Sequence, residues 1–165
     1  MPDKSTNADL FERAIAIEDL QGEFYKILSE KFAHNREAAD FWKKLEEDEM
    51  QHTHLLESIR RTQPPDRLQV EVGPSVVSMA NEILKITAEE RASSIANLND
   101  AYEQAYNQEN SELNMLFKFL VREFSRSDNV RKFAMAEVEN HIQKLWDFPR
   151  TLGNIEWRKS VKIKE

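Results

Sequence analysis

The stretch from Phe41 to Leu56, FWKKLEEDEMQHTHLL, places two polar side chains on the apolar face of a helix. Residues three apart lie on one side of a helix, so Glu49 and His52 can converge on a single point. The positions one and two turns away on this face are apolar: Phe41, Leu45, Leu56 and Ile59. Because a carboxylate and an imidazole that face a core need polar partners, this spacing predicts a metal site.

The composition favours long helices. The 165 residues include 3 Gly and 5 Pro, and 32% are charged, which fits a helical bundle better than an all-β fold with many turns. The length predicts one domain, which we place at residues 1–148, followed by a C-terminal tail over 149–165. We therefore expect an all-α bundle.

Charge and cysteine content exclude several classes of function. The chain has no cysteine, so disulfides, thiolate catalysis and cysteine-ligated metals are excluded, and a bound metal must take oxygen and nitrogen ligands. The net charge of -7 argues against nucleic acid and anionic membranes as partners. No signal-peptide pattern is present, and no apolar run approaches the ~20 residues of a membrane span, so we expect a cytoplasmic protein.

Two helices joined by a short loop are expected at the start of the chain. Apolar periodicity predicts the first over about 8–32, with Asn7 as its N-cap, and the second over about 36–61. A loop this short makes the helices antiparallel neighbours. Glu18 faces inward, and at ~1.5 Å per residue both Glu18 and Glu49 come ~20 Å from the loop. The two carboxylates are therefore expected at one level of the bundle.

A crossover and a third helix are expected next. Residues 62–74 contain two adjacent prolines and alternating apolar positions, so they are predicted to be extended and long enough to travel the length of the bundle. A third helix, predicted over about 75–107, would then run parallel to the second. Glu90 is its best inward carboxylate, although a shift of the apolar stripe by one residue would turn it outward.

The last third of the chain does not decide which residues supply the remaining ligands of the site. Residues 111–126 and 129–148 form either one long kinked helix or a fourth helix followed by an extra C-terminal one. Counting depth from the preceding turn, Glu123 is the residue expected to face Glu90. Three residues later, however, stands Arg126, whose guanidinium stays protonated and cannot bind a metal.

The local pattern favours His141 instead. It is followed four residues later by leucine, as His52 is. Three residues before it stands Val138, and the alternative Glu137 has Asn140 at the matching spacing. Neither register restores a second Glu-x-x-His, but an inserted helical turn or two would bring His141 to the required depth, so both candidates stay open.

The first two helices resemble those of a known family. AIAIEDLQGEFYKILSEKF, in which Glu18 is followed seven residues later by Tyr25, and FWKKLEEDEMQH are similar to the ligand helices of the rubrerythrin branch of the ferritin-like superfamily. The resemblance implies an up-down four-helix bundle with one long crossover that holds two irons. It implies a terminal ligand at Glu18, a bridging ligand at Glu49, a nitrogen ligand at His52 and a catalytic position beside the metals at Tyr25.

The resemblance covers the first third of the chain, and the second half departs from the family's pattern. The ligand set expected from the sequence is Glu18, Glu49, His52, Glu90 and Glu123, holding one or two ions of iron, with zinc or manganese as alternatives. For Tyr25 the alternative is an ordinary core tyrosine whose hydroxyl bonds a neighbour.

These residues are compatible with two functions. The first is a rubrerythrin-like oxidoreductase that acts on peroxide or ferrous iron and self-associates as a dimer. Because the chain lacks cysteine, it would need a separate electron donor. The second is a bundle with a degenerate metal site that serves as a non-catalytic scaffold or partner-binding module.

Overall fold

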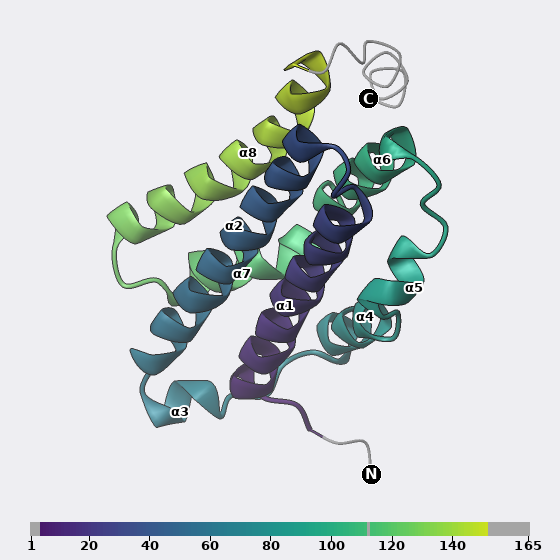
Figure 1. Cartoon of the computed structure of the whole chain (residues 1–165). Coiled ribbons are helices and arrows are strands. Elements are labelled where there is room, and N and C mark those ends of the chain that lie inside the picture. Colours follow the sequence, from purple (N-terminus) through teal and green to yellow (C-terminus); the bar gives the residue numbers. More distant parts are fainter. Residues whose placement is uncertain (1–3, 112, 152–165) are drawn as a thin grey trace.

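The computed structural model describes residues 4–111 and 113–151, and this part of the chain is all-helical (Figure 1). Its helices are α1 (Asn7–Lys31), α2 (Arg36–Arg61), α3 (Pro65–Leu68), α4 (Pro74–Leu84), α5 (Ala88–Ala92), α6 (Leu98–Glu109), α7 (Leu113–Phe124) and α8 (Asp128–Thr151). The predicted all-α class is confirmed. The predicted tail over 149–165 lies outside the described residues from 152 onward. Within the described residues, none of the helices combines the length and apolarity needed to cross a membrane.

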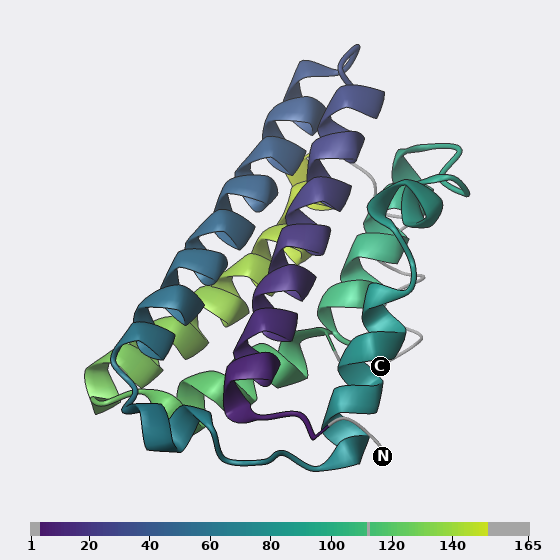
Figure 2. The ribbon, with the colours of Figure 1, turned by 90° about the horizontal axis from the view of Figure 1, so that it is seen from below.

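α1 and α2 form the antiparallel hairpin that periodicity predicts, and both views show them side by side along their length (Figure 1, Figure 2). The N-cap of α1 is Thr6, one residue before the predicted Asn7. Its hydroxyl accepts from the backbone N–H of Asp9, and the Asp9 carboxylate accepts from the N–H of Thr6. Asn35 caps α2 by accepting from the N–H of Ala38. These caps fix both ends of the short loop.

The crossover after α2 is extended only in its second half. Pro65 occupies the first turn of α3, where a residue without a backbone N–H is tolerated, so this part of the prediction was wrong. Beyond α3 the chain pairs with the N-terminal segment. The N–H of Asn7 donates to the carbonyl of Val70 at 2.9 Å, and the N–H of Val72 donates to the carbonyl of Ser5 at 3.0 Å. The crossover is thereby tied to the start of α1.

The prediction of one continuous third helix over 75–107 was wrong, because that segment forms α4, α5 and α6. Two capping side chains start the new helices. The Thr87 hydroxyl accepts from the N–H of Glu90 at 3.1 Å, and the Asn97 side chain accepts from the N–H of Asp100 at 2.9 Å. As a result, α4 and α5 pack against α1, while α6 contacts α7 and α8.

α7 and α8 are two separate helices rather than one kinked helix. The Ser127 hydroxyl accepts from the N–H of Val130 at 3.2 Å and starts α8. The side-chain amide of Gln63 donates to the carbonyl of Phe124 at 2.8 Å, which ties the end of α7 to the end of α2. α7 contacts α1 and α2, and α8 packs against α2, α6 and α7 (Figure 1).

Two apolar clusters fill the bundle, with polar residues between them on the same helices. Phe24, Trp42 and Leu145 belong to one cluster. The other contains apolar side chains of the same three helices, Ile17, Leu56 and Val138. The buried polar residues that fall between the clusters along α1, α2 and α8 are Glu18, Gln21, Asp48, Glu49, His52, Thr53 and His141. The core therefore has a polar layer across its middle.

Gly22 lies on α1 next to the polar layer and faces Glu49 of α2. A Cβ at Gly22 would lie 3.5 Å from the Cβ of Glu49, which is ordinary van der Waals contact. Since glycine inside a helix costs about 0.5–1 kcal/mol relative to alanine, we expect Gly22→Ala to raise the free energy of unfolding by about that amount. Urea denaturation would measure it. Gly22→Leu is the contrasting variant and should destabilise the protein, because its larger side chain would push Glu49 aside; equal stability of both variants would contradict this packing.

Candidate metal centre

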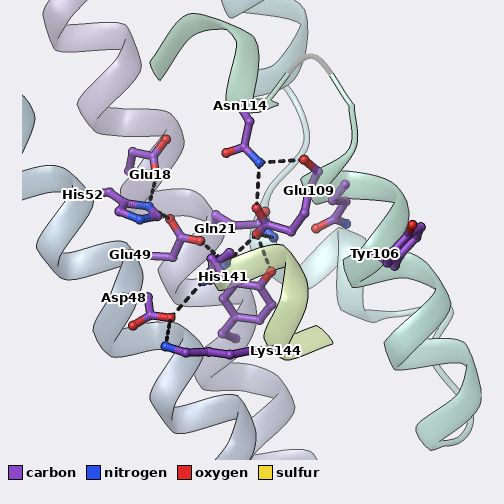
Figure 3. Close-up of polar contacts among 12 residues, drawn as sticks. Glu18, Gln21, Asp48, Glu49, His52, Tyr106, Glu109, Asn114, His141 and Lys144 are labelled. Atoms are coloured by element: carbon purple, nitrogen blue, oxygen red, sulfur yellow. Dashed lines mark hydrogen bonds and ion pairs between the residues drawn. The ribbon is translucent and has the colours of Figure 1, made fainter. Parts of the chain in front are cut away.

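Within and beside the polar layer, three carboxylates and two imidazoles from four helices form a cluster that could hold metal ions (Figure 3). Their side chains are almost fully buried, with the whole residues between 1% and 4% exposed. α1 supplies one carboxylate, α2 a carboxylate and an imidazole, α6 a carboxylate and α8 an imidazole: Glu18, Glu49, His52, Glu109 and His141. They form two groups that share Glu49, and within each group the donor atoms lie within 4.8 Å of one another.

The first group consists of Glu18, Glu49 and His52. Nδ1 of His52 lies 3.2 Å from Oε2 of Glu18 and 3.1 Å from Oε2 of Glu49. The ring of His52 packs against Phe117 at a centroid separation of 4.9 Å. Its Nε2 is buried and has no hydrogen-bond partner in the described part of the chain. The motif that α2 carries thus meets α1 as the sequence predicts.

The second group consists of Glu49, Glu109 and His141. Nε2 of His141 lies 2.9 Å from Oε1 of Glu49 and 3.0 Å from Oε1 of Glu109. Glu49 therefore presents one oxygen to His52 and the other to His141. A carboxylate in this position can bridge two metal ions, each also bound by one imidazole and one further carboxylate.

His141 is held in a defined orientation by the neighbour of Glu49. Nδ1 of His141 lies 3.0 Å from Oδ2 of Asp48, and Nζ of Lys144 donates to the same oxygen at 2.8 Å. A carboxylate on one ring nitrogen fixes the tautomer and makes the other nitrogen a better metal ligand. The second group is in this respect better oriented than the first, where Nε2 of His52 lacks such a partner.

Glu109 is surrounded by hydrogen-bond donors. The hydroxyl of Tyr25 donates to its Oε1, and the side-chain amide of Gln21 donates to the same atom at 3.3 Å. The amide of Asn114 donates to Oε2 at 2.9 Å and to the backbone carbonyl of Glu109 at 2.6 Å. The ring of Tyr25 stacks on Trp42 at 5.9 Å. Tyr25 therefore lies beside the candidate site and is a core tyrosine with a bonded hydroxyl at the same time.

Burial and mutual charge shift the pKa values of the cluster in opposite directions. Burial raises the pKa of Glu18 well above its ordinary value, and the charge of Glu49 raises it further. Burial also opposes ionisation of Glu49, but the charge of His141 and hydrogen bonds from both imidazoles hold the pKa of Glu49 well below its ordinary value. The pKa of Glu18 therefore lies above that of Glu49 in the metal-free protein, and Glu49 loses its proton more readily.

Contacts with carboxylates raise the pKa of both imidazoles in the metal-free cluster. Burial lowers the pKa of His52, but its contacts with Glu18 and Glu49 outweigh burial and raise it to about 10. For His141 burial again opposes the charge, and the carboxylates of Glu109, Glu49 and Asp48 raise the pKa well above its ordinary value. At neutral pH a metal ion must displace a proton from His52, and the raised pKa of His141 makes protons compete with a metal there as well.

Two residues expected from the sequence do not join the cluster. Glu90 is exposed, and its carboxylate accepts from the N–H of Thr87 at 3.2 Å as part of the cap of α5. Glu123 is exposed on α7. Both expectations assumed an unbroken third helix, and the turns between α4, α5 and α6 alter which residues reach the level of Glu49.

Glu109 replaces them, and the sequence analysis did not consider it. It is the last residue of α6 and lies in a polar stretch, NQENSEL, that gives no apolar stripe of its own. One signal could have found it: Ala101, Ala105 and Glu109 recur every four residues, which places Glu109 on the buried side of the helix. His141, one of the two open candidates for the last helix, is the one that the structure brings to the cluster.

Comparisons of the chain with models of protein families, with curated proteins and with solved structures gave no match. The functional argument therefore rests on the residues of the site.

Proposed function

We propose that this chain binds two divalent metal ions within a ferritin-like bundle formed by α1, α2, α6 and α8, with Glu49 as the bridging ligand. The observation that carries the proposal is the position of Glu49. Its Oε2 lies 3.1 Å from Nδ1 of His52, and its Oε1 lies 2.9 Å from Nε2 of His141. One ion would take Glu18, Glu49 and His52, and the other would take Glu49, Glu109 and His141.

The donor set combines carboxylate oxygen with imidazole nitrogen and contains no sulfur, which suits iron, manganese or zinc; the resemblance of α1 and α2 favours iron among them. Together with the rubrerythrin-like α1 and α2, it supports an oxidoreductase that acts on peroxide or ferrous iron. Iron in this position would supply electron exchange with such an oxidant. The chain itself contributes the buried ligands and Tyr25, a proton donor in contact with Glu109. Electrons would come from a separate donor.

Metal titration of the purified, metal-free chain tests the proposal. We expect two Fe²⁺ ions per chain under anaerobic conditions, and two ions in parallel titrations with Mn²⁺ or Zn²⁺. Elemental analysis of the protein after gel filtration would give the stoichiometry independently. Absence of bound metal in all three titrations would contradict the proposal.

A scaffold without metal is the second candidate, and one observation favours it. His52 and His141 each contact two or more carboxylates, so the charges in the cluster offset one another without an ion. This candidate predicts no specific metal uptake and a thermal midpoint that added metal leaves unchanged. If the chain binds metal as proposed, added metal should raise the thermal midpoint, because a ligand present at 100 times its Kd stabilises the folded state by about 2.7 kcal/mol.

Metal affinity should increase with pH. The pKa of His52 is raised to about 10, so at neutral pH an ion must displace its proton, and the pKa of His141 is also raised, so protons compete with the second ion. For each displaced proton, we expect the affinity to increase about tenfold per pH unit between roughly pH 6 and pH 9. Calorimetric Zn²⁺ titrations in buffers of different ionisation enthalpy would measure the protons released. An affinity independent of pH would contradict this protonation scheme.

A further inference from the structure

A pocket of about 830 Å³ lies between α4, α5 and α6, the three short helices that follow one another along one side of the hairpin (Figure 1). α4 contributes Ile83, α5 contributes Arg91, and α6 contributes Asp100, Gln104 and Gln108 among others. Apart from Ile83, every lining residue is polar or charged. None of the proposed metal ligands lines the pocket, so it is distinct from the metal centre. Its volume is in the range of small-molecule sites, about 300–1,000 Å³.

Arg91 is a half-buried cation on the wall of this pocket. Its Nη2 donates to the carbonyl of Ile83 at 2.8 Å, whereas its Nε is buried and finds no acceptor among the residues that the structure describes. Burial lowers the pKa of Arg91, and across residues 4–111 and 113–151 no carboxylate pairs with it to oppose that effect. A guanidinium removed from water without a partner is costly, and its N–H groups match the oxygens of a carboxylate.

The α6 wall of the pocket carries hydrogen-bond acceptors. Oδ2 of Asp100 accepts from the backbone N–H of Ala96 at 3.1 Å, so this carboxylate is held by the backbone and not by Arg91. Oε1 of Gln108 is buried and, within the described ranges, accepts no hydrogen bond. The side-chain amide of Gln104 donates to the carbonyl of Arg91 at 2.6 Å and ties α6 to α5. The pocket therefore has a cationic donor on α5 and acceptors on α6 that do not satisfy one another.

We propose that this pocket binds a small zwitterion, a free amino acid, with its carboxylate on Arg91 and its ammonium group on Asp100 and Gln108. Such a ligand brings an acceptor to the guanidinium and a donor to the α6 wall, so the groups that lack partners gain them. A ligand with only negative charge would be repelled by Asp100, and one with only positive charge would be repelled by Arg91. The volume leaves room for accompanying water, since one water takes about 30 Å³ in the liquid.

Ligand binding to the purified full chain tests the inference. Each standard amino acid is added singly, and the one that raises the thermal midpoint most is titrated by calorimetry, together with its carboxamide and its N-acetyl derivative. The first derivative removes the charge of the carboxylate, and the second removes the charge of the ammonium group. We expect both derivatives to bind at least about tenfold more weakly than the free amino acid, because each loses a charge-assisted hydrogen bond.

Two variants assign the contacts. Arg91→Met removes the guanidinium, so the Kd of the amino acid should rise by about tenfold or more, and the difference between the amino acid and its carboxamide should disappear. A general loss of stability would not remove that difference. Asp100→Asn can still accept from the N–H of Ala96 and should abolish the preference over the N-acetyl derivative. Arg36→Met and Asp66→Asn make the same changes at exposed positions outside the pocket and should bind as the wild type does.

Three results would overturn the inference. One is that no standard amino acid binds the wild-type chain. Another is that the amino acid and its carboxamide bind the wild type equally well, a comparison that stays decisive even if Arg91→Met does not fold. The third is a wild-type Kd in Arg91→Met and Asp100→Asn while their circular dichroism is unchanged. None of these measurements requires a metal ion, so their failure would leave the proposed function untouched.

Discussion

Glu49→Gln is expected to abolish the tight binding of both metal ions. Glu49 is shared by the two ligand groups, and its two oxygens face different imidazoles at 3.1 and 2.9 Å. Glutamine keeps the shape of the side chain but loses the negative charge, and its amide nitrogen cannot bind a metal as a carboxylate oxygen does. We expect each affinity to fall by at least about 100-fold, as measured by Zn²⁺ or Mn²⁺ titration calorimetry.

Glu47→Gln is the matched control, because Glu47 is exposed on the same helix only two positions away. It makes the same chemical change and removes the same charge from the chain, and it should leave both ions bound. Retention of two ions by Glu49→Gln would show that Glu49 does not bridge. Loss of metal in both variants would point to the overall charge rather than the site.

His52→Ala and His141→Ala are each expected to remove one ion and leave the other. His52 belongs only to the group with Glu18, and His141 belongs only to the group with Glu109. Each imidazole is the single nitrogen ligand of its group, so its loss should reduce the stoichiometry from two to one. Elemental analysis and titration of both variants would give the numbers directly.

The same pair of variants decides between His141 and Glu123. If Glu123 supplied the ligand of the last helix, His141→Ala would leave the metal content unchanged. The structure favours His141 as the ligand, because His141 is 1% exposed within the cluster whereas Glu123 is exposed on α7. Glu123→Ala should therefore behave as the wild type, and a loss of metal in that variant would contradict the assignment.

The hairpin of α1 and α2 could be predicted because its signals are local. Capping residues, a short loop and apolar periodicity fix where each helix begins and ends, and Glu49-x-x-His52 needs only one face of one helix. Glu18 could be predicted as a partner of Glu49 because the two residues lie at about the same distance from the loop on two continuous helices. The contact of His52 with both carboxylates is what that reasoning anticipated.

The far half could not be predicted in the same way, because depth was counted along a helix that does not exist. Thr87 and Asn97 start new helices inside 75–107, and each turn changes how far the chain advances along the bundle. Glu90 becomes a capping residue, and Glu109 reaches the cluster from the end of α6. Whether a threonine inside an apolar pattern caps a helix or continues it depends on tertiary contacts that the local sequence does not contain.

The distribution of ligands along the chain has a consequence for assembly. Glu18 and His52 are 34 positions apart within one hairpin, whereas His141 is 93 positions from Asp48. If the proposed ions bind, the first can be captured as soon as the hairpin has emerged from the ribosome. The second must wait for α6 and α8, and it then acts as a cross-link that closes a long loop. Opening of α8 away from a persistent hairpin would accordingly be the route by which this ion is lost.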